Sequence, residues 1–209
     1  MAKSRRRPAD KFEERRRELA ESALVTLGEL GYARTTLREI ASNSEFSHGV
    51  LHYYFSDKLD LIVFCVQLYK ARCVHRYDAV VESSTTPDEL LDGFLGKLAE
   101  TIVEEAPMHR LWYDLRSQSM FEEALREPVR VIDQTLEDMV WRVVCRYAEL
   151  LDVRPMMTPA LAYGLLDGLF QLALHGYTAG REDALTTLQD EVRAVVALLF
   201  RDALETSAV

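Results

Sequence analysis

The chain has 209 residues, of which 48% are apolar and 28% charged, and its formal net charge is −9. This composition is sufficient for a sizeable core that needs no metal ion or disulfide to fold. No run of about 18 apolar residues is present and the N-terminus is charged, so we expect neither a membrane span nor a secretory signal, and a cytoplasmic location. Three cysteines, an odd number in apolar helical patterns, favour reduced thiols over a disulfide framework, with redox sensing as the alternative.

Charge is distributed unevenly along the chain. Residues 1–60 hold 11 Lys and Arg against 10 Asp and Glu, which leaves 14 against 24 for residues 61–209. The basic side chains concentrate at Lys3, Arg5, Arg6, Arg7, Lys11 and 15–17. An acidic protein with a basic end would approach nucleic acid by that end. The alternative is that residues 1–8 form a flexible, solvated basic arm, and the sequence leaves both interpretations open.

The first sixty residues predict three helices. Apolar residues recur at helical spacing from about Ala9 to Leu30, and Gly31 lies where the residue after a helix belongs. Thr36 and Glu39 form a capping box that starts a second, short helix. After a polar turn at residues 43–45, Ser47 can cap a third helix that runs to about Phe55. Two short helices joined by a tight turn are typical of a helix-turn-helix, whose second helix enters a DNA major groove.

A longer pattern in this segment resembles the DNA-binding part of TetR-type bacterial regulators, and it is carried by Ile40, Ala41, Ser47, Gly49, Leu51, Tyr54, Phe55, Lys58 and Leu61. Two departures stand out. The family's usual Ala-Gly-Val at the turn is replaced by residues 44–46, Ser-Glu-Phe, and its usual first Tyr of the recognition helix is His52. A side-chain-bearing residue in the left-handed conformation at this turn would cost on the order of 1 kcal/mol.

The resemblance and the charge distribution together imply a set of DNA-binding residues: Arg5, Arg6, Arg7, Arg34, Thr36, Arg38, Ser47, His48, Gly49, His52, Tyr53 and Lys58. Arg34 can reach a phosphate, with a plain surface cation as the alternative. His48 and His52 are four residues apart, which is also a metal-ligand spacing. No third ligand is evident nearby, so we expect DNA contact, and neither a metal nor a cofactor.

The remaining chain predicts helices throughout. We expect one long helix from Asp57 to about Val81, a linker at 83–87, and a helix opened by Thr86 and closed by Pro107. A short apolar segment follows at 108–118, then a long amphipathic helix at 121–151 with Pro128 as a kink or restart. Thr158 and Pro159 open the next helix, to about 177, and a last one covers about 183–204. The fold class is all-α with about nine helices, divided into a DNA-binding domain at 1–56 and a ligand-binding and dimerisation domain at 57–209.

Aromatic and methionine side chains mark a candidate ligand pocket in the second domain: Phe94, Met108, Trp112, Tyr113, Met120, Phe121, Trp141 and Tyr147. Their helical spacing is equally compatible with a simple core. Trp112 and Tyr113 are adjacent and cannot share one helix face, so this segment must either be buried or line a pocket. Aromatic faces suit flat, apolar or cationic ligands. Polar candidates to orient a ligand are His109, Asp114, Arg116 and His175, with surface or structural roles as the alternative. No nucleophile or phosphate-loop motif is present, so we expect no enzyme.

The last two helices predict a dimer. Each carries an apolar stripe, and two such helices from each of two protomers can form a four-helix interface. Residues 165–170 are similar to the C-terminal domain of the BetI-like, choline-responsive subgroup, which implies dimerisation. The predicted interface consists of Leu161, Leu165, Gly168, Leu169, Leu172, Leu188, Val192, Val195 and Leu199.

These features together predict a homodimeric transcriptional repressor. It would release a palindromic operator in double-stranded DNA when a small-molecule effector, of unidentified chemistry, binds the second domain. The alternative is a constitutive DNA-binding dimer that is controlled by a partner protein. An enclosed cavity of roughly several hundred Å³ between the middle helices would favour the repressor.

Overall fold

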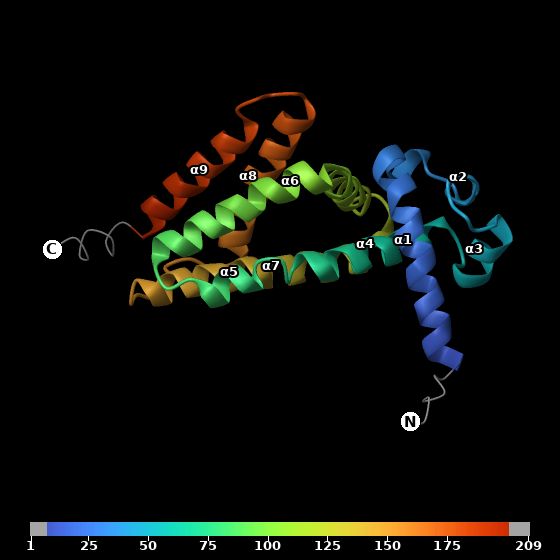
Figure 1. Ribbon diagram of the computed structural model, residues 1–209, viewed down its shortest axis with the longest axis horizontal. Helices are drawn as coiled ribbons and strands as arrows, with labels where there is room; N and C mark the ends of the chain where they lie inside the picture. Colours follow the sequence, from blue (N-terminus) through green and yellow to red (C-terminus); the bar gives the residue numbers. More distant parts are fainter. Residues whose placement is uncertain (1–7, 201–209) are drawn as a thin grey trace. The chain divides into compact units, whose positions relative to one another are not determined.

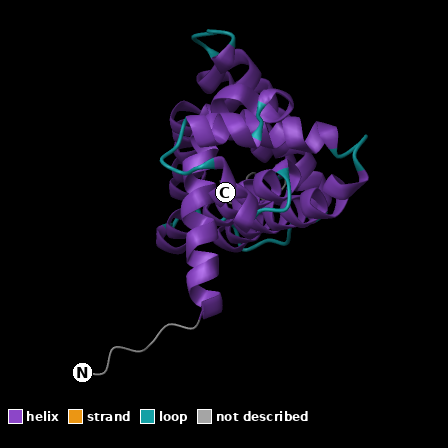
Figure 2. Cartoon of the chain, turned by 90° about the vertical axis from the view of Figure 1, so that its right-hand side faces the viewer, coloured by secondary structure: helices purple, strands orange, loops and turns teal. Residues whose placement is uncertain are grey.

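The computed structural model describes residues 8–200, and within that range the chain forms nine α-helices and no strand. Figure 1 labels these helices in chain order, and Figure 2 shows the loops that join them. The prediction of an all-α fold is confirmed. No helix among these residues is long and apolar enough to cross a membrane. The chain divides into two compact units: one contains the residues up to Ala71 together with Arg110–Val129, the other Arg72–His109 together with the chain from Arg130 onward. A functional boundary at residue 56 stays a prediction.

The first unit is built on four N-terminal helices, α1 (Pro8–Arg34), α2 (Leu37–Ser42), α3 (His48–Tyr54) and α4 (Lys58–Cys73). The segment 110–129 belongs to it as well. Helices α1, α2 and α3 contact one another pairwise. Their apolar stripes converge on a core without solvent contact, because α2 and α3 are too short to bury a face alone. The central side chains are Leu19, Ala23, Leu27, Ile40, Leu51, Phe55, Leu61 and Ile62.

The second unit contains α5 (Asp78–Ser83), most of α6 (Pro87–Gln118), most of α7 (Glu123–Leu150), α8 (Pro159–Thr178) and α9 (Ala184–Leu199). Helix α8 begins where the sequence predicts, because Thr158 Oγ1 accepts the N–H of Leu161 at 3.3 Å and Pro159 fills the first helical position. Helices α8 and α9 form a contacting pair, drawn in red in Figure 1.

The prediction of one helix from Asp57 to Val81 is wrong. Helix α4 ends at Cys73, and α5 begins only at Asp78. Tertiary bonds hold the intervening turn open: Arg142 Nη2 donates to the carbonyl of Val74 at 2.7 Å, and Arg76 donates to Thr101 Oγ1 at 2.6 Å. Because these partners come from α6 and α7, the sequence near the turn does not predict the end of α4.

The expected helix end at Pro107 is observed as a kink rather than as a separate loop. Helix α6 continues to Gln118, and the disturbance is confined to Glu105, whose φ of −131° and ψ of 23° are not helical. A proline inside a helix removes one backbone donor and crowds the preceding turn. Buried apolar residues on both sides, Ile102 and Leu111, hold the two halves of α6 in place, so the chain accommodates Pro107 as a kink.

Candidate nucleic-acid interface

Helix α2 is fixed at its start by the predicted capping box. Thr36 Oγ1 accepts the N–H of Glu39 at 3.2 Å, and the Glu39 carboxylate accepts the N–H of Thr36 at 2.7 Å. Both bonds satisfy backbone donors that a helix leaves unpaired at its first turn. The cap aims the N-terminus of this short helix outward, with Leu37 and Ile40 beneath it in the core.

The turn between α2 and α3 avoids the strain expected from its sequence. Among residues 8–200, Asp152 is the single non-glycine residue with positive φ, so Glu45 does not adopt the left-handed conformation. Instead, Ser44 Oγ accepts the N–H of Phe46 at 3.2 Å, which closes the turn locally. Phe46 is buried, and the Arg15 guanidinium lies 4.6 Å from its ring centroid. The turn is thus held by the Ser44 bond and by the buried Phe46, and Glu45 stands at the glycine position without a left-handed backbone.

Helix α3 presents an exposed polar row. Ser47 Oγ accepts the N–H of Val50 at 3.3 Å and starts the helix, and Leu51 on the opposite side is fully buried. His48 and His52 are exposed with ring centroids 4.4 Å apart, and Tyr53 is 73% exposed. This arrangement is suited to reading base edges and phosphates in a major groove.

Gly49 lies in the first turn of α3 and is exposed. A Cβ added there would meet only Ser47 Oγ, at 4.0 Å, and its φ is not in the left-handed region. Neither packing nor backbone conformation therefore requires a glycine at this position.

The other predicted DNA-binding residues take several positions. Arg38 is exposed on α2, and Arg34 is exposed with its Nε donating to the carbonyl of Leu30 at 3.3 Å. Lys58 is half-buried, with its ammonium 4.4 Å from the ring centroid of Tyr32. Arg5, Arg6 and Arg7 lie outside the described residues.

Part of the basic N-terminal stretch is structural. Arg16 Nη2 donates to Asp60 at 2.9 Å, and its guanidinium lies 4.8 Å from the ring centroid of Phe55 and 4.4 Å from that of Phe64. Such a planar, paired cation stabilises the packing of α1 on α4. Arg16 therefore fastens the helix-turn-helix to α4, and its charge is largely neutralised there.

Sequence reasoning missed Tyr32, which links three segments of the first unit. Gly31 takes φ 74° and ends the regular part of α1, and the next N–H, of Tyr32, donates to Asp114 Oδ2 at 2.8 Å. The Tyr32 hydroxyl donates to the Glu122 carboxylate. Partial burial, then the bond to Glu122 and its charge, raise the pKa of Tyr32 to about 12. Asp114, considered above for a ligand, thus has a structural partner, and only the Gly31 signal could have hinted at it.

The predicted ligand residues are divided between the two units. Trp112, Tyr113, Met120 and Phe121 belong to the first unit, and the other four belong to the second. Phe94, Trp112 and Tyr147 are buried, whereas Met108, Tyr113 and Trp141 are half-buried. Met120 is 70% and Phe121 85% exposed, in the turn between α6 and α7. The predicted set remains a hypothesis.

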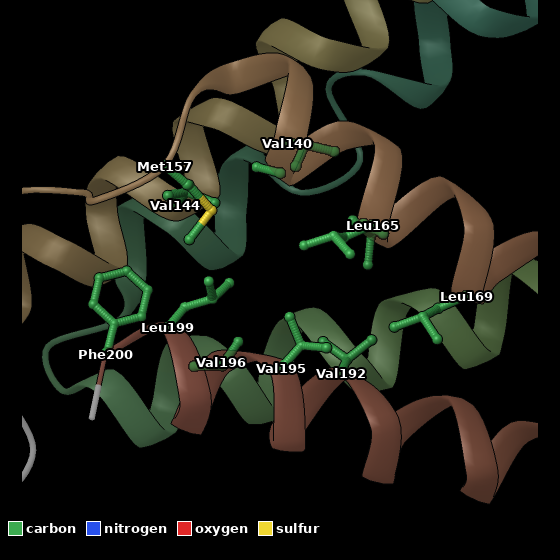
Figure 3. Close-up of a pocket in the computed structure, with 12 residues that line it drawn as sticks. Val140, Val144, Met157, Leu165, Leu169, Val192, Val195, Val196, Leu199 and Phe200 are labelled. Carbon is green, nitrogen blue, oxygen red and sulfur yellow. The ribbon is translucent and has the colours of Figure 1, made fainter.

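An apolar pocket of about 70 Å³ lies within the second unit, between α7, α8 and α9 (Figure 3). Figure 3 shows Leu165 and Leu169 of α8 facing Val192 and Val195 of α9 across it. Its walls are almost entirely aliphatic, and none of the eight predicted ligand residues lines it. Five residues of the predicted dimer interface do: Leu165, Leu169, Val192, Val195 and Leu199.

Some of the predicted dimer residues are buried within the protomer, and others are exposed. Leu188 and Val192 are buried within the protomer, whereas Leu161 is 51%, Leu165 38% and Leu172 70% exposed. Gly168, and Gly164 one turn before it, have no atom within 4 Å of an added Cβ, so both leave space beside α8. Leu198 on α9, 61% exposed, extends the apolar surface beyond the predicted set.

Comparison with known sequences identifies relatives of this arrangement. Residues 19–63, which span the end of α1 through the start of α4, match the family described as bacterial regulatory proteins of the tetR family. The HTH-type transcriptional regulator BetI of Burkholderia thailandensis is 29% identical over 174 residues, covering 79% of this chain and 83% of that protein. BetI of Burkholderia mallei is 27% identical over 190 residues, covering 88% and 94%.

Solved structures show the same fold. A TetR transcription regulator from Haloarcula marismortui aligns with a TM-score of 0.73 at 21% identity, covering 90% of this chain and 99% of that one. The regulator FadR of Bacillus subtilis, solved in complex with stearoyl-CoA, aligns with a TM-score of 0.68 at 16% identity, covering 88% and 97%. The family match coincides with the helix-turn-helix, and full-length transcriptional regulators align over most of the chain. Residues 19–63 are therefore similar to the tetR family of bacterial regulatory proteins, and the chain as a whole is similar to transcriptional regulators such as BetI.

Proposed function

We propose that the protein is a homodimeric repressor that binds a palindromic operator through α2 and α3 and releases it when a small organic molecule binds its helical body. The observation that carries the proposal is the exposed row of α3. His48, His52 and Tyr53 face solvent on a helix whose opposite side is locked into the core by Leu51. Gly49 supports it further, because the fold itself does not need a glycine there. A close approach of a DNA phosphate or base to the α3 backbone would require a glycine at this position.

The DNA-binding part is tested by selecting bound sequences from a random duplex library. The expected result is two inverted half-sites whose centres are separated by about one helical turn, roughly 34–36 Å, or a multiple of it. His52→Ala should then relax the preference at one position of each half-site by about 1–3 kcal/mol. An equal loss on specific and non-specific DNA would assign His52 to a phosphate contact. A single, asymmetric half-site would contradict the dimeric mode of binding.

Exposed apolar area on α8 and α9 supports the dimer. Leu161, Leu165, Leu172 and Leu198 together expose the area of about two whole leucine side chains per protomer. Burying these in both protomers would contribute about 6–12 kcal/mol, at about 1.5–3 kcal/mol per side chain. Association costs about 4–15 kcal/mol in lost freedom. The two ranges overlap, so burial of the leucines is comparable to the cost of association, and a few further contacts along Gly164 and Gly168 would decide whether the dimer is stable.

Leu172→Glu tests this interface, with Val103→Glu as the matched control. Val103 is 51% exposed on α6, which is not one of the two helices of the proposed interface. Burying glutamate requires protonation, which at pH 8 costs about 5 kcal/mol per side chain, and symmetry doubles the cost. We expect sedimentation at 10 µM or so to show a folded monomer for Leu172→Glu and a dimer for Val103→Glu. A Leu172→Glu dimer with wild-type stability would place the interface elsewhere.

Effector release can use three covalent connections between the units. Helix α4 reaches the unit boundary at Ala71, α6 crosses it after the kink at Glu105, and α7 crosses it after Val129. A ligand that changes the direction of any of these helices changes the separation of the two α3 helices in a dimer. Losing a few good base contacts, at about 1–3 kcal/mol each, would be enough to empty an operator. FadR with its bound stearoyl-CoA supports the idea that this fold accommodates a small-molecule effector.

A further inference from the structure

Two hydrogen-bond donors are buried side by side in the first unit. Trp112 of α6 is 1% exposed, and its indole Nε1–H has no hydrogen-bond partner among the described residues. Lys70 of α4 is 3% exposed. Its ammonium lies 5.3 Å from the ring centroid of Trp112 and 5.5 Å from that of Tyr69.

The unpaired indole N–H indicates which kind of chemical group would bind here. A buried polar group without a partner loses its hydration and gains nothing in return, and native structures contain few of them. The indole nitrogen can only donate. A group that completes the site must therefore bring an acceptor, such as a carbonyl or carboxylate oxygen.

Lys70 determines the charge that the site prefers. Its ammonium already lies over the faces of Trp112 and Tyr69, where a cationic ligand would otherwise bind. A second cation at these rings would be held close to a like charge in a weakly screened interior. Lys70 has a further interaction of its own, but an ammonium has three N–H groups and can donate to a ligand oxygen as well. Of the ligand types that an aromatic face accepts, a cation is therefore disfavoured here, and the site suits an anionic acceptor.

We propose that Trp112 and Lys70 form a head-group subsite for an effector that carries a carboxylate. One carboxylate oxygen accepts the indole N–H, and the ammonium of Lys70 donates to the same group. The apolar part of the effector would pack against aliphatic side chains one helical turn away, Val66 on α4 and Leu115 on α6, which are buried in the same unit. This inference rests on the proposed function, because it names the ligand class of the same regulatory response.

Nuclear magnetic resonance can observe the indole directly. The chain contains two tryptophans, so the full-length protein shows two indole N–H signals, and Trp112→Phe identifies the one from Trp112. Three probes share one tail and differ in the head group: hexanoate, 1-hexanol and hexyltrimethylammonium. We expect hexanoate to move the Trp112 proton downfield in a saturable way, with an affinity at least tenfold above that of hexanol. Hexyltrimethylammonium should leave the signal in place.

Variants of Lys70 test the second donor. Lys70→Met keeps the length of the side chain without the charge, and should weaken hexanoate binding about tenfold or more while hexanol binding stays unchanged. Lys70→Arg retains a cation and should preserve the preference for hexanoate, which keeps the test valid if Lys70→Met does not fold. An indole signal that ignores hexanoate, that responds equally to all three probes, or that prefers the cation overturns the proposal.

The failure of this subsite and the failure of the repressor can be told apart. If a cationic or neutral compound releases the operator while the Trp112 signal ignores hexanoate, the subsite is wrong and the ligand-responsive repressor stands. If hexanoate moves the Trp112 signal with the expected selectivity and no small molecule weakens operator binding, the subsite stands and the ligand-responsive repressor is wrong.

Discussion

Gly49→Ala separates DNA contact from folding more sharply than any other single change on α3. In the free protein an added Cβ meets only the Ser47 hydroxyl, at 4.0 Å. Alanine is also the better helix former, by up to about 1 kcal/mol in a helix interior and less in a first turn. We therefore expect the variant to be as stable as wild type or slightly more so. On DNA, the methyl group would push the α3 backbone away from the phosphates.

The expected loss of affinity follows from two symmetric half-sites. One hydrogen bond to a charged phosphate contributes about 1.5–3 kcal/mol, and losing one in each half-site weakens operator binding about 100-fold or more. Fluorescence anisotropy with a labelled operator measures the affinity, and urea unfolding measures the stability. Gly96→Ala is the control, since Gly96 is exposed on α6 with no atom within 4 Å of its added Cβ. It should gain similar stability and bind DNA normally. Wild-type affinity for Gly49→Ala would refute a close approach of DNA at this residue.

Three further expectations test the arm, the buried tyrosine and the α1–α2 turn. Removing residues 1–7 takes away four basic residues, and every phosphate that the arm no longer neutralises should lower the salt dependence of operator binding by about 0.9; an unchanged slope would make the arm a spectator. Burial raises the pKa of Tyr77 from 10.0 to about 12. The protonated Tyr77 hydroxyl therefore contributes fully to the free energy of unfolding below pH 10, and this contribution, about 3 kcal/mol, is lost by pH 12. Urea unfolding of Tyr77→Phe should not show this loss over the same pH range. Asp114→Ala leaves the N–H of Tyr32 unpaired and should lower the free energy of unfolding by about 1–3 kcal/mol, whereas no change would mean that water replaces the carboxylate.

Elements with local signals were predictable from the sequence. Thr36 with Glu39, and Thr158 with Pro159, supply their own hydrogen-bond partners within four residues, so the starts of α2 and α8 do not depend on distant packing. The burial of Ile40 and Leu51 also follows from helical spacing alone. These are the parts of the chain where local preference and tertiary structure agree.

Features set by tertiary contacts were not predictable. The break between α4 and α5 depends on Arg142, a residue 68 positions from the Val74 carbonyl that it holds. Arg16 lies in the basic stretch expected to contact DNA. In the structure its guanidinium instead binds Asp60 and packs on two phenylalanine rings. In both cases an arginine binds a group that is far away in the sequence. The spacing of residues along the chain does not indicate which group that will be.

The contacts of Tyr32 connect the recognition machinery to α6 within one compact unit. Its N–H is held by Asp114 and its hydroxyl by Glu122, and four residues later Thr36 caps α2. If the segment 110–129 moves, the α1–α2 turn must therefore move with it, or the bonds of Tyr32 to Asp114 and Glu122 must break. The kink at Glu105 lies just before this segment, where α6 is least constrained by its own hydrogen bonds. A ligand that alters the kink would thus act on the start of α2 through Tyr32 even if α4 kept its orientation.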